Sequence, residues 1–314
     1  MTARSRLPRL ARTLGAVTGA ALLAFSLAGP ATAATHTTTL GLTTQPAAAD
    51  HHGAPDYYVS LGDSLAAGYQ PNVGHNTDVS YTDQLYAQLK QHDPNLVHVK
   101  LGCSGETTET MIDGGICSYP GAKSQLDAAV QFLRAHRGHV RYVTLDIGAN
   151  DVDGCLAGGS IDLACAAKGI ATVAVQVPEI TAALHAAGGG RPQYAGMNYY
   201  DPFLAVWLTG PSGQQAARLS ATLGVALNGA IEVGLKLGGF HVADVATAFS
   251  TLDFTDQATL PGVGQVPLNV ARICEWTWEC TPYHDIHATP TGHAVIAGVF
   301  RDVFRDVFRQ DQHH

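Results

Sequence analysis

Apolar segments of two kinds alternate along the chain from residue 57 onwards. Short β-branched or aromatic runs predict buried strands at residues 57–61, 95–101, 140–147, 193–199 and 240–245. Apolar residues three and four apart predict helices at residues 81–91, 121–136, 166–187, 212–237 and 291–304, and Pro178 is expected to kink the third of these. This alternation of strand and helix favours one α/β domain, with a mainly parallel sheet covered by helices on both faces.

The first 33 residues have the pattern of an export signal. An apolar run at residues 14–28 ends at the small-residue site Ala31-Thr32-Ala33, and arginines precede it at positions 4, 6, 9 and 12. The run is too short for a convincing membrane span. We therefore expect a cleaved signal peptide at 1–33, a flexible linker at 34–54, the folded domain at 55–308 and a C-terminal tail at 309–314, in a secreted, extracellular protein.

Composition and charge narrow the classes of partner. The chain carries a formal net charge of −8 at pH 7, and removal of the signal segment with its arginines makes it more acidic. An acidic chain without basic clusters is a poor binder of nucleic acid or of anionic membrane surfaces. We expect neither a nucleic acid partner nor integral membrane association, and we expect a monomer that needs no cofactor.

The six cysteines are expected to form disulfides because the chain is exported to an oxidising compartment. They lie as sequence neighbours, which favours the pairs Cys103–Cys117, Cys155–Cys165 and Cys274–Cys280, although sequence alone does not choose among the possible connectivities. A metal site is the alternative, but the chain has no Cys-x-x-Cys spacing to support one.

Four short segments carry the candidate chemistry, and three of them follow predicted strands. They are Gly62-Asp63-Ser64-Leu65, Gly102-Cys103-Ser104-Gly105-Glu106-Thr107, Gly148-Ala149-Asn150-Asp151 and His284-Asp285-Ile286-His287. Taken singly, each is compatible with an ordinary turn. In this order they resemble the blocks of the SGNH hydrolases, also called GDSL esterases and lipases. The resemblance spans about residues 56–300 and implies a three-layer α/β/α sandwich with a flavodoxin-like sheet.

The resemblance also implies a role for each segment. Ser64 would be the nucleophile, which needs a base to take its proton, and His287 would be that base. The oxyanion would be met by the backbone N–H of Ser64, the backbone N–H of Gly105 and the side-chain amide of Asn150. Gly102 competes with Gly105, but Ser104-Gly105-Glu106-Thr107 matches the spacing of the family better.

The acid of the triad is the point where the sequence departs from the family pattern. The usual acid lies three residues before the histidine, and that position holds His284. Asp285 lies two residues before His287 and is our candidate, while a main-chain carbonyl that orients His287 is the alternative. His284, Asp285, His287 and His293 match no defensible zinc spacing, so we expect no metal.

The sequence therefore predicts a secreted serine esterase or lipase that acts through an acyl-enzyme on Ser64. Its substrate would be a small-molecule, lipid or polysaccharide ester, because fold and triad do not choose among these. An acyltransferase using the same acyl-enzyme, or a non-catalytic binding protein on the same scaffold, are the alternatives. Trp276 and Trp278, between Cys274 and Cys280, are predicted either to wall an acyl pocket or to form a small satellite core.

Overall fold

The computed structural model describes residues 54–157 and 160–311, with the side chains at 156–160 and beyond 305 left aside. The predicted signal peptide at 1–33, nearly all of the predicted linker and the last residues of the predicted tail lie outside the described residues. Among the described residues, the fold is built on one five-stranded sheet with the order β4-β1-β5-β8-β9.

The central sheet is parallel throughout. Its strands are β1 (Tyr57–Gly62), β4 (Val97–Lys100), β5 (Val140–Asp146), β8 (Gln193–Met197) and β9 (His241–Ala243). Counted along the chain, this order is 2-1-3-4-5, which is the flavodoxin-like arrangement. The predicted fold class is thus confirmed. Every strand of the sheet was expected, although β8 and β9 end earlier than the sequence pattern indicated.

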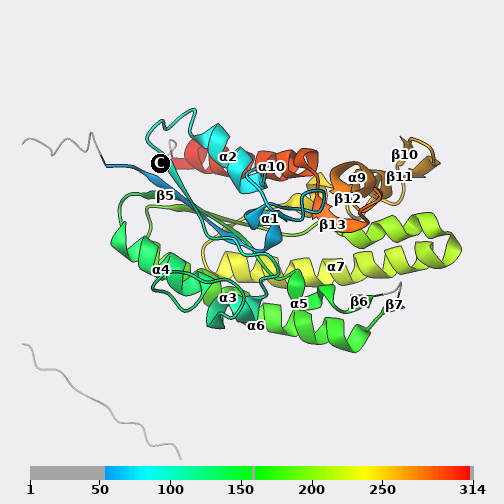
Figure 1. Ribbon diagram of the computed structural model, residues 1–314, viewed down its shortest axis with the longest axis horizontal. Helices are drawn as coiled ribbons and strands as arrows, with labels where there is room; N and C mark the ends of the chain where they lie inside the picture. The colour runs from blue at the N-terminus through cyan, green and yellow to red at the C-terminus, as the bar shows by residue number, and fades with distance from the viewer. Residues whose placement is uncertain (1–53, 158–159, 312–314) are drawn as a thin grey trace, which may run out of the picture. The chain divides into compact units, whose positions relative to one another are not determined.

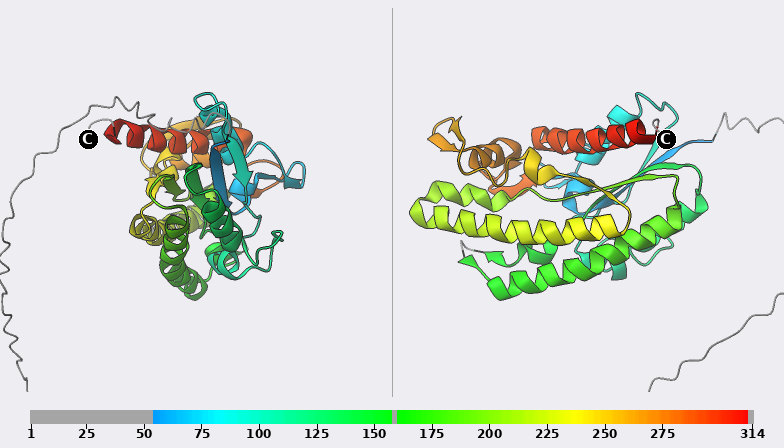
Figure 2. Two further views of the ribbon diagram at one scale, coloured as in Figure 1. Left: turned by 90° about the vertical axis from the view of Figure 1, so that its left-hand side faces the viewer. Right: turned by 180° about the vertical axis from the view of Figure 1, so that it is seen from behind.

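Helices cover both faces of this sheet (Figure 1). On one face lie α2 (Tyr81–Leu89) and α10 (Pro290–Asp311), which pack against each other (Figure 2), with α2 in contact with β4 and α10 in contact with β8 and β9. On the other face lie α3 (Thr108–Asp113), α4 (Gln125–Ala135), α6 (Leu163–Gly188) and α7 (Pro211–Leu237). The buried core runs between the layers, because the side chains of β1 and β5 are almost entirely enclosed.

Shorter elements surround the carboxyl ends of the strands. The helical ones are α1 (Ser64–Ala67), α5 (Asn150–Asp153), the 3₁₀ helix η1 (Pro202–Thr209), α8 (Val245–Ala248) and α9 (Leu268–Trp276). Four antiparallel hairpins join β2 (Tyr69–Gln70) to β3 (His75–Asn76), β6 (Leu156–Ala157) to β7 (Ser160–Ile161), β10 (Gln257–Leu260) to β11 (Gly264–Pro267), and β12 (Thr277–Trp278) to β13 (Asp285–Ala288).

Helix α6 is long and apolar enough to cross a membrane by length and composition. It packs instead within the helical layer, against α4, α5 and α7. Gly169 and Gly234 allow these close approaches, since a Cβ on Gly169 would lie 2.2 Å from the Asp151 carbonyl oxygen and one on Gly234 would lie 2.7 Å from Val177. Helix α6 is therefore a packed part of the helical layer, although only 28% of its apolar window is buried.

Candidate active site

The turn after β1 presents Ser64 at the carboxyl edge of the sheet. Asp63 caps the short helix α1 by accepting a hydrogen bond at Oδ1 from the backbone N–H of Leu65, at 2.9 Å. Gly62 precedes it with φ of +148°, and a Cβ there would lie 2.0 Å from Oδ1 of Asp146. Only glycine fits this position, so the turn that delivers Ser64 is fixed by its neighbours on β5.

His287 reaches Ser64 from strand β13, near the other end of the chain. Its Nε2 lies 2.7 Å from Oγ of Ser64, and its Nδ1 lies 2.6 Å from Oδ1 of Asp285. Asp285 also accepts the backbone N–H of His287 at 2.9 Å. The three side chains therefore form a continuous chain of hydrogen bonds from carboxylate to hydroxyl.

The strand geometry of β13 explains why a spacing of two residues suffices. Successive side chains of a strand point to opposite faces, so Asp285 and His287 project to the same side. Burial would raise the pKa of the Asp285 carboxyl, but the hydrogen bonds from the His287 ring and backbone lower it below its usual value. His284, at the position of the usual acid, is exposed and contacts the Glu279 carbonyl oxygen at 3.2 Å instead.

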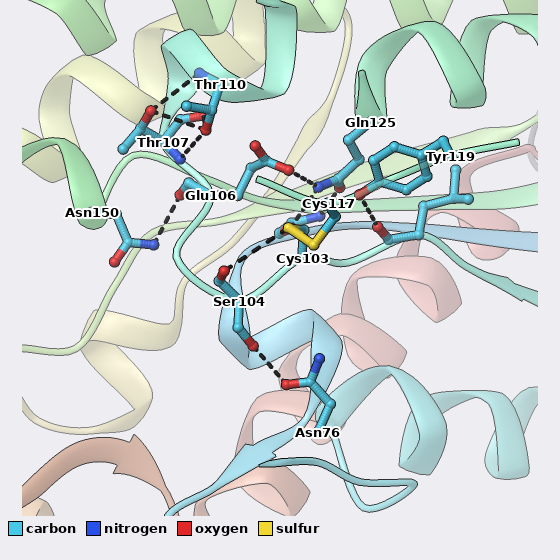
Figure 3. The surroundings of a disulfide bond; sticks show 12 residues. Asn76, Cys103, Ser104, Glu106, Thr107, Thr110, Cys117, Tyr119, Gln125 and Asn150 are labelled. Atoms are coloured by element: carbon cyan, nitrogen blue, oxygen red, sulfur yellow. Dashed lines mark hydrogen bonds between the residues drawn. A yellow bond between two sulfur atoms is a disulfide. The ribbon is translucent and has the colours of Figure 1, made fainter. Parts of the chain in front are cut away.

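The loop that carries Gly105 is held against the nucleophile turn (Figure 3). The disulfide Cys103–Cys117 closes it, and the buried carboxylate of Glu106 accepts a hydrogen bond from Gln125 at 2.8 Å. The amide of Gln125 also accepts from the Gly62 N–H at 2.6 Å and donates to the Gly62 oxygen at 3.0 Å. One glutamine thus ties the second segment to the first.

The two glycines of this loop differ in their environment. Gly105 has φ of +83°, and a Cβ there would meet nothing within 4 Å, so its backbone faces open space. Gly102 packs so closely on α1 that a Cβ would lie 2.7 Å from the Ala67 nitrogen. The packing of Gly102 against α1 accounts for a glycine at that position.

Asn150 begins α5, directly after β5, and lines the same pocket as Ser64 and His287. One N–H of its side-chain amide donates to the carbonyl oxygen of Glu106 at 2.8 Å (Figure 3). An amide has two such hydrogens, so a second donor remains to meet a ligand. The neighbouring Asp151 accepts from the Thr108 backbone N–H at 3.0 Å, which fixes α5 to the start of α3.

A buried pair of carboxyl groups lies beneath the nucleophile, and no sequence pattern predicted it. Asp146, at the end of β5, has 0% exposure and contacts Asp63, whose backbone N–H is 3.4 Å from its Oδ2. The hydroxyl of Tyr81 donates to Asp146 at 2.6 Å, and that of Tyr199 donates to Asp63 at 2.7 Å. Burial and the adjacent Asp63 charge raise the pKa of Asp146 well above its usual value.

A second serine–histidine pair lies in the core, with Oγ of Ser60 2.8 Å from Nε2 of His98. The hydrogen-bond length fits a catalytic pair, but Ser60 has 0% exposure in the middle of β1, where no substrate can reach it. The His98 ring stacks on Tyr58 with ring centroids 4.6 Å apart, and burial lowers its pKa to about 4. This pair stabilises the core, and Ser64 is the serine that faces a pocket.

The pocket beside Ser64 and His287 has a volume of about 100 Å³ and lies between α5, α6, η1 and α7. Its walls are mostly apolar, formed by Leu65, Val152, Ile170, Phe203, Leu223 and Leu227. Neither Trp276 nor Trp278 is part of them. Trp276 packs on Phe249 with ring centroids 5.0 Å apart, and Trp278 donates to Gln70 at 3.1 Å. Trp276 thus packs against the main core, so the structure bears out neither an acyl-pocket wall nor a separate satellite core for this residue.

The six cysteines form the three sequence-neighbour disulfides, Cys103–Cys117, Cys155–Cys165 and Cys274–Cys280. Within the described part of the chain, no group of three or more His, Cys, Asp or Glu side chains is arranged to hold a metal ion. His293 is fully buried on α10, where its Nδ1 accepts the Tyr81 backbone N–H at 3.1 Å.

A flavodoxin-like sheet with a hydrogen-bonded serine, histidine and aspartate at its carboxyl edge defines the class of serine-dependent ester hydrolases. The chain belongs to the GDSL-like lipase/acylhydrolase family, whose sequence model matches residues 60–295. It is therefore an esterase of this family. Its disulfides are of the kind found in exported proteins. No curated protein sequence matches the chain.

One solved structure supports the same fold at low sequence identity, and two others are reported as similar. An extracellular lipase from Streptomyces rimosus matches with a TM-score of 0.52 at 18% identity, covering 79% of this chain and 99% of that one. A phospholipase A1 from Streptomyces albidoflavus has a TM-score of 0.45 at 16% identity, covering 70% and 95%. An acetylxylan esterase from Geobacillus stearothermophilus has 0.45 at 13% identity, covering 79% and 93%.

Proposed function

We propose that the protein is a secreted esterase in which Ser64 forms an acyl-enzyme and His287 acts as general base and acid. The observation that supports this most directly is the 2.7 Å approach of His287 Nε2 to Ser64 Oγ, at the mouth of an apolar pocket. His287 takes the hydroxyl proton as the oxygen attacks the ester carbonyl, and returns that proton to the leaving alcohol. Water then attacks the acyl-enzyme by the reverse route and releases the acid.

Asp285 and the oxyanion donors complete the proposed machinery. Asp285 holds the proton of His287 on Nδ1 and stabilises the imidazolium that forms, which the 2.6 Å contact between the two side chains supports. The backbone N–H groups of Ser64 and Gly105 and the amide of Asn150 meet the oxyanion. The disulfide Cys103–Cys117 keeps the Gly105 loop rigid, and rigid donors are those that stabilise a transition state most.

Secretion belongs to the same proposal. Removal of residues 1–33 by a signal peptidase would leave a mature chain that begins before β1 and contains all six cysteines. N-terminal sequencing of protein collected from the culture medium should find residue 34 at the start. A mature chain that begins at Met1, or that is found only inside the cell, would contradict export through this signal.

The catalytic proposal is tested by covalent labelling. A fluorophosphonate probe should label the purified protein at Ser64 and should not label Ser64→Ala, and the same variant should lose hydrolysis of 4-nitrophenyl acetate. Ser60→Ala, which removes the buried serine, serves as the matched control and should still be labelled. A protein that is not labelled would be a binding protein on this scaffold. Preferential transfer of the acyl group to an added alcohol would indicate an acyltransferase.

A further inference from the structure

The charged groups that line the pocket beside Ser64 are of one sign. Among the described residues that line it, the charged side chains are Asp63, Asp153 and Asp201, with neither lysine nor arginine. Asp63 is already engaged by Tyr199 and by the cap of α1. The carboxylate of Asp153 accepts no hydrogen bond from any described residue, although Asp153 is partly buried. A pocket of this kind holds a negative potential that neither lysine nor arginine in its described lining neutralises, and His287 is its one basic side chain.

Asp201 adds an unsatisfied acceptor to the same pocket. One oxygen, Oδ1, accepts from the Phe203 backbone N–H at 3.0 Å and from the Ser220 hydroxyl at 2.9 Å. The other oxygen, Oδ2, has no partner among the described residues, although Asp201 is only 6% exposed. Oγ of Thr251, which lines the same pocket, also has none. A buried carboxylate oxygen without a donor is costly, and a ligand that supplies the donor removes that cost.

A further carboxyl group, that of Glu279, interacts electrostatically with the acids of this pocket. Burial and the charge of Asp285 raise the pKa of Glu279 to about 7, and the charges of Asp153 and Asp201 add to the rise. Burial raises the pKa of Asp201 to about 6, which leaves its carboxylate largely ionised at neutral pH. The carboxylates around the pocket thus act on one another across it. A positive charge placed among them would interact favourably with each.

Aromatic rings complete the lining. Tyr199, Tyr200 and Phe203 follow β8 and contribute to the pocket wall. The hydroxyls of the two tyrosines are engaged elsewhere, with Tyr199 bonded to Asp63 and Tyr200 to the Ile286 carbonyl at 2.9 Å. Aromatic rings together with carboxylates in an apolar pocket are the chemistry that recognises ammonium groups.

We propose that this pocket selects esters whose bound portion carries an ammonium group, with Asp153 and Asp201 as the selecting residues. The inference rests on the proposed function, because it concerns the same pocket. It also implies discrimination against esters whose bound portion carries a phosphate or carboxylate, since these would be held among like charges without a compensating cation.

The test is a charge series at constant chain length. In the first series the substrates are 4-nitrophenyl hexanoates whose acyl chain ends in methyl, hydroxyl, ammonium or carboxylate. In the second series they are acetate esters of hexanols with the same four endings, so that the charge lies on the alcohol. We expect kcat/KM for the ammonium ester to exceed that for the methyl ester about tenfold, and the carboxylate ester to fall about tenfold below the methyl ester. Added salt should reduce the spread. The same kcat/KM for all four endings in both series overturns the proposal, as does a hydroxyl ester equal to the ammonium ester.

The variants assign the selectivity to residues. Asp153→Asn and Asp201→Asn should each lower the ratio of kcat/KM between the ammonium and carboxylate esters, a ratio that cancels any general loss of activity. Asp113→Asn makes the same charge change at an exposed site on α3 and should leave the ratio unchanged. If Asp201→Asn fails to fold, Asp153→Asn alone carries the comparison. A ratio unchanged in the folded variants would contradict the assignment to these residues.

A binding measurement separates this inference from the catalytic proposal. Calorimetry on Ser64→Ala should find that hexylammonium binds more tightly than 1-hexanol, and that Asp153→Asn in the same background removes the difference. This readout does not depend on hydrolysis. If the methyl ester is not hydrolysed, the catalytic proposal fails while the ammonium preference is still measured. If the methyl ester is hydrolysed and hexylammonium binds no better than hexanol, only the ammonium inference fails.

Discussion

His293 makes the fold sensitive to acid in a way that the structure allows us to calculate. The side chain lies on α10 with 0% exposure, and its Nδ1 accepts the Tyr81 backbone N–H at 3.1 Å. The ring is therefore neutral, with its proton on Nε2. Burial, with a smaller contribution from the nearby His287, lowers the pKa of His293 from 6.5 to about 3. Protonation would remove the acceptor that joins α10 to the first turn of α2.

The sign and size of the effect follow from linkage. Because the pKa of His293 is lower in the folded protein than in the unfolded chain, the unfolded chain binds more protons between about pH 6.5 and pH 3. The free energy of unfolding therefore falls as the pH falls through this window. For pKa values of 6.5 and about 3, the loss between neutral pH and about pH 5 is about 2 kcal/mol. Such a loss is a large share of the stability of a typical domain.

The assay compares denaturant unfolding of the wild type and His293→Asn at about pH 7 and about pH 5. Asparagine places a carbonyl oxygen near the position of Nδ1 and does not titrate, so the variant should lose about 2 kcal/mol less than the wild type over this interval. His98 is present in both proteins and cancels in the comparison. His241→Asn removes an exposed histidine and should keep the wild-type dependence. Equal pH dependence in wild type and His293→Asn would refute the reasoning.

Three further predictions concern the site and its support. Asp285→Asn removes the carboxylate 2.6 Å from Nδ1 of His287 and should lower kcat on 4-nitrophenyl acetate by on the order of 10²–10⁴. A near-normal rate would indicate that a main-chain carbonyl orients the histidine. Asn150→Ala should lower kcat by about 10²–10³ with a smaller change in KM, and an unchanged kcat would remove Asn150 from the oxyanion site. Replacing Cys103 and Cys117 together by serine opens a loop with a sequence separation of 14 and should lower the free energy of unfolding by about 3 kcal/mol in denaturant titration.

The sheet and its long helices could be predicted from the sequence, because buried apolar residues recur with the period of a strand or a helix. Residues 140–147 predicted β5, and residues 212–237 predicted α7 almost to the residue. Helix α4 begins at Gln125, later than expected, because Ser124 caps it by accepting the Asp127 N–H. The short elements α5, α8 and α9 were missed, since a helix of one or two turns produces too little periodicity.

The site residues could be predicted where they belong to the four sequence motifs. They could not be predicted where their role depends on contacts between residues distant in sequence. The four segments pointed to Ser64 and His287, which the structure brings within hydrogen-bonding distance. Asp146 and Asp201 gave no comparable signal. Each follows or ends a buried strand, where an acid resembles an ordinary turn residue until its neighbours in space are known. Asp146 is contacted from α2 and from the turn after β1, and Asp201 is contacted from α7, so no short stretch of sequence contains either environment.

The distance in sequence between the reacting groups has a consequence for how the protein becomes active. Ser64 and His287 lie 223 positions apart, and the histidine enters on a hairpin that precedes only the final helix. During synthesis from the N-terminus, the Ser64 hydroxyl is made early but has no proton acceptor until synthesis has passed residue 287. Fragments that stop before residue 287 would therefore be catalytically inactive, even if their first strands form the sheet.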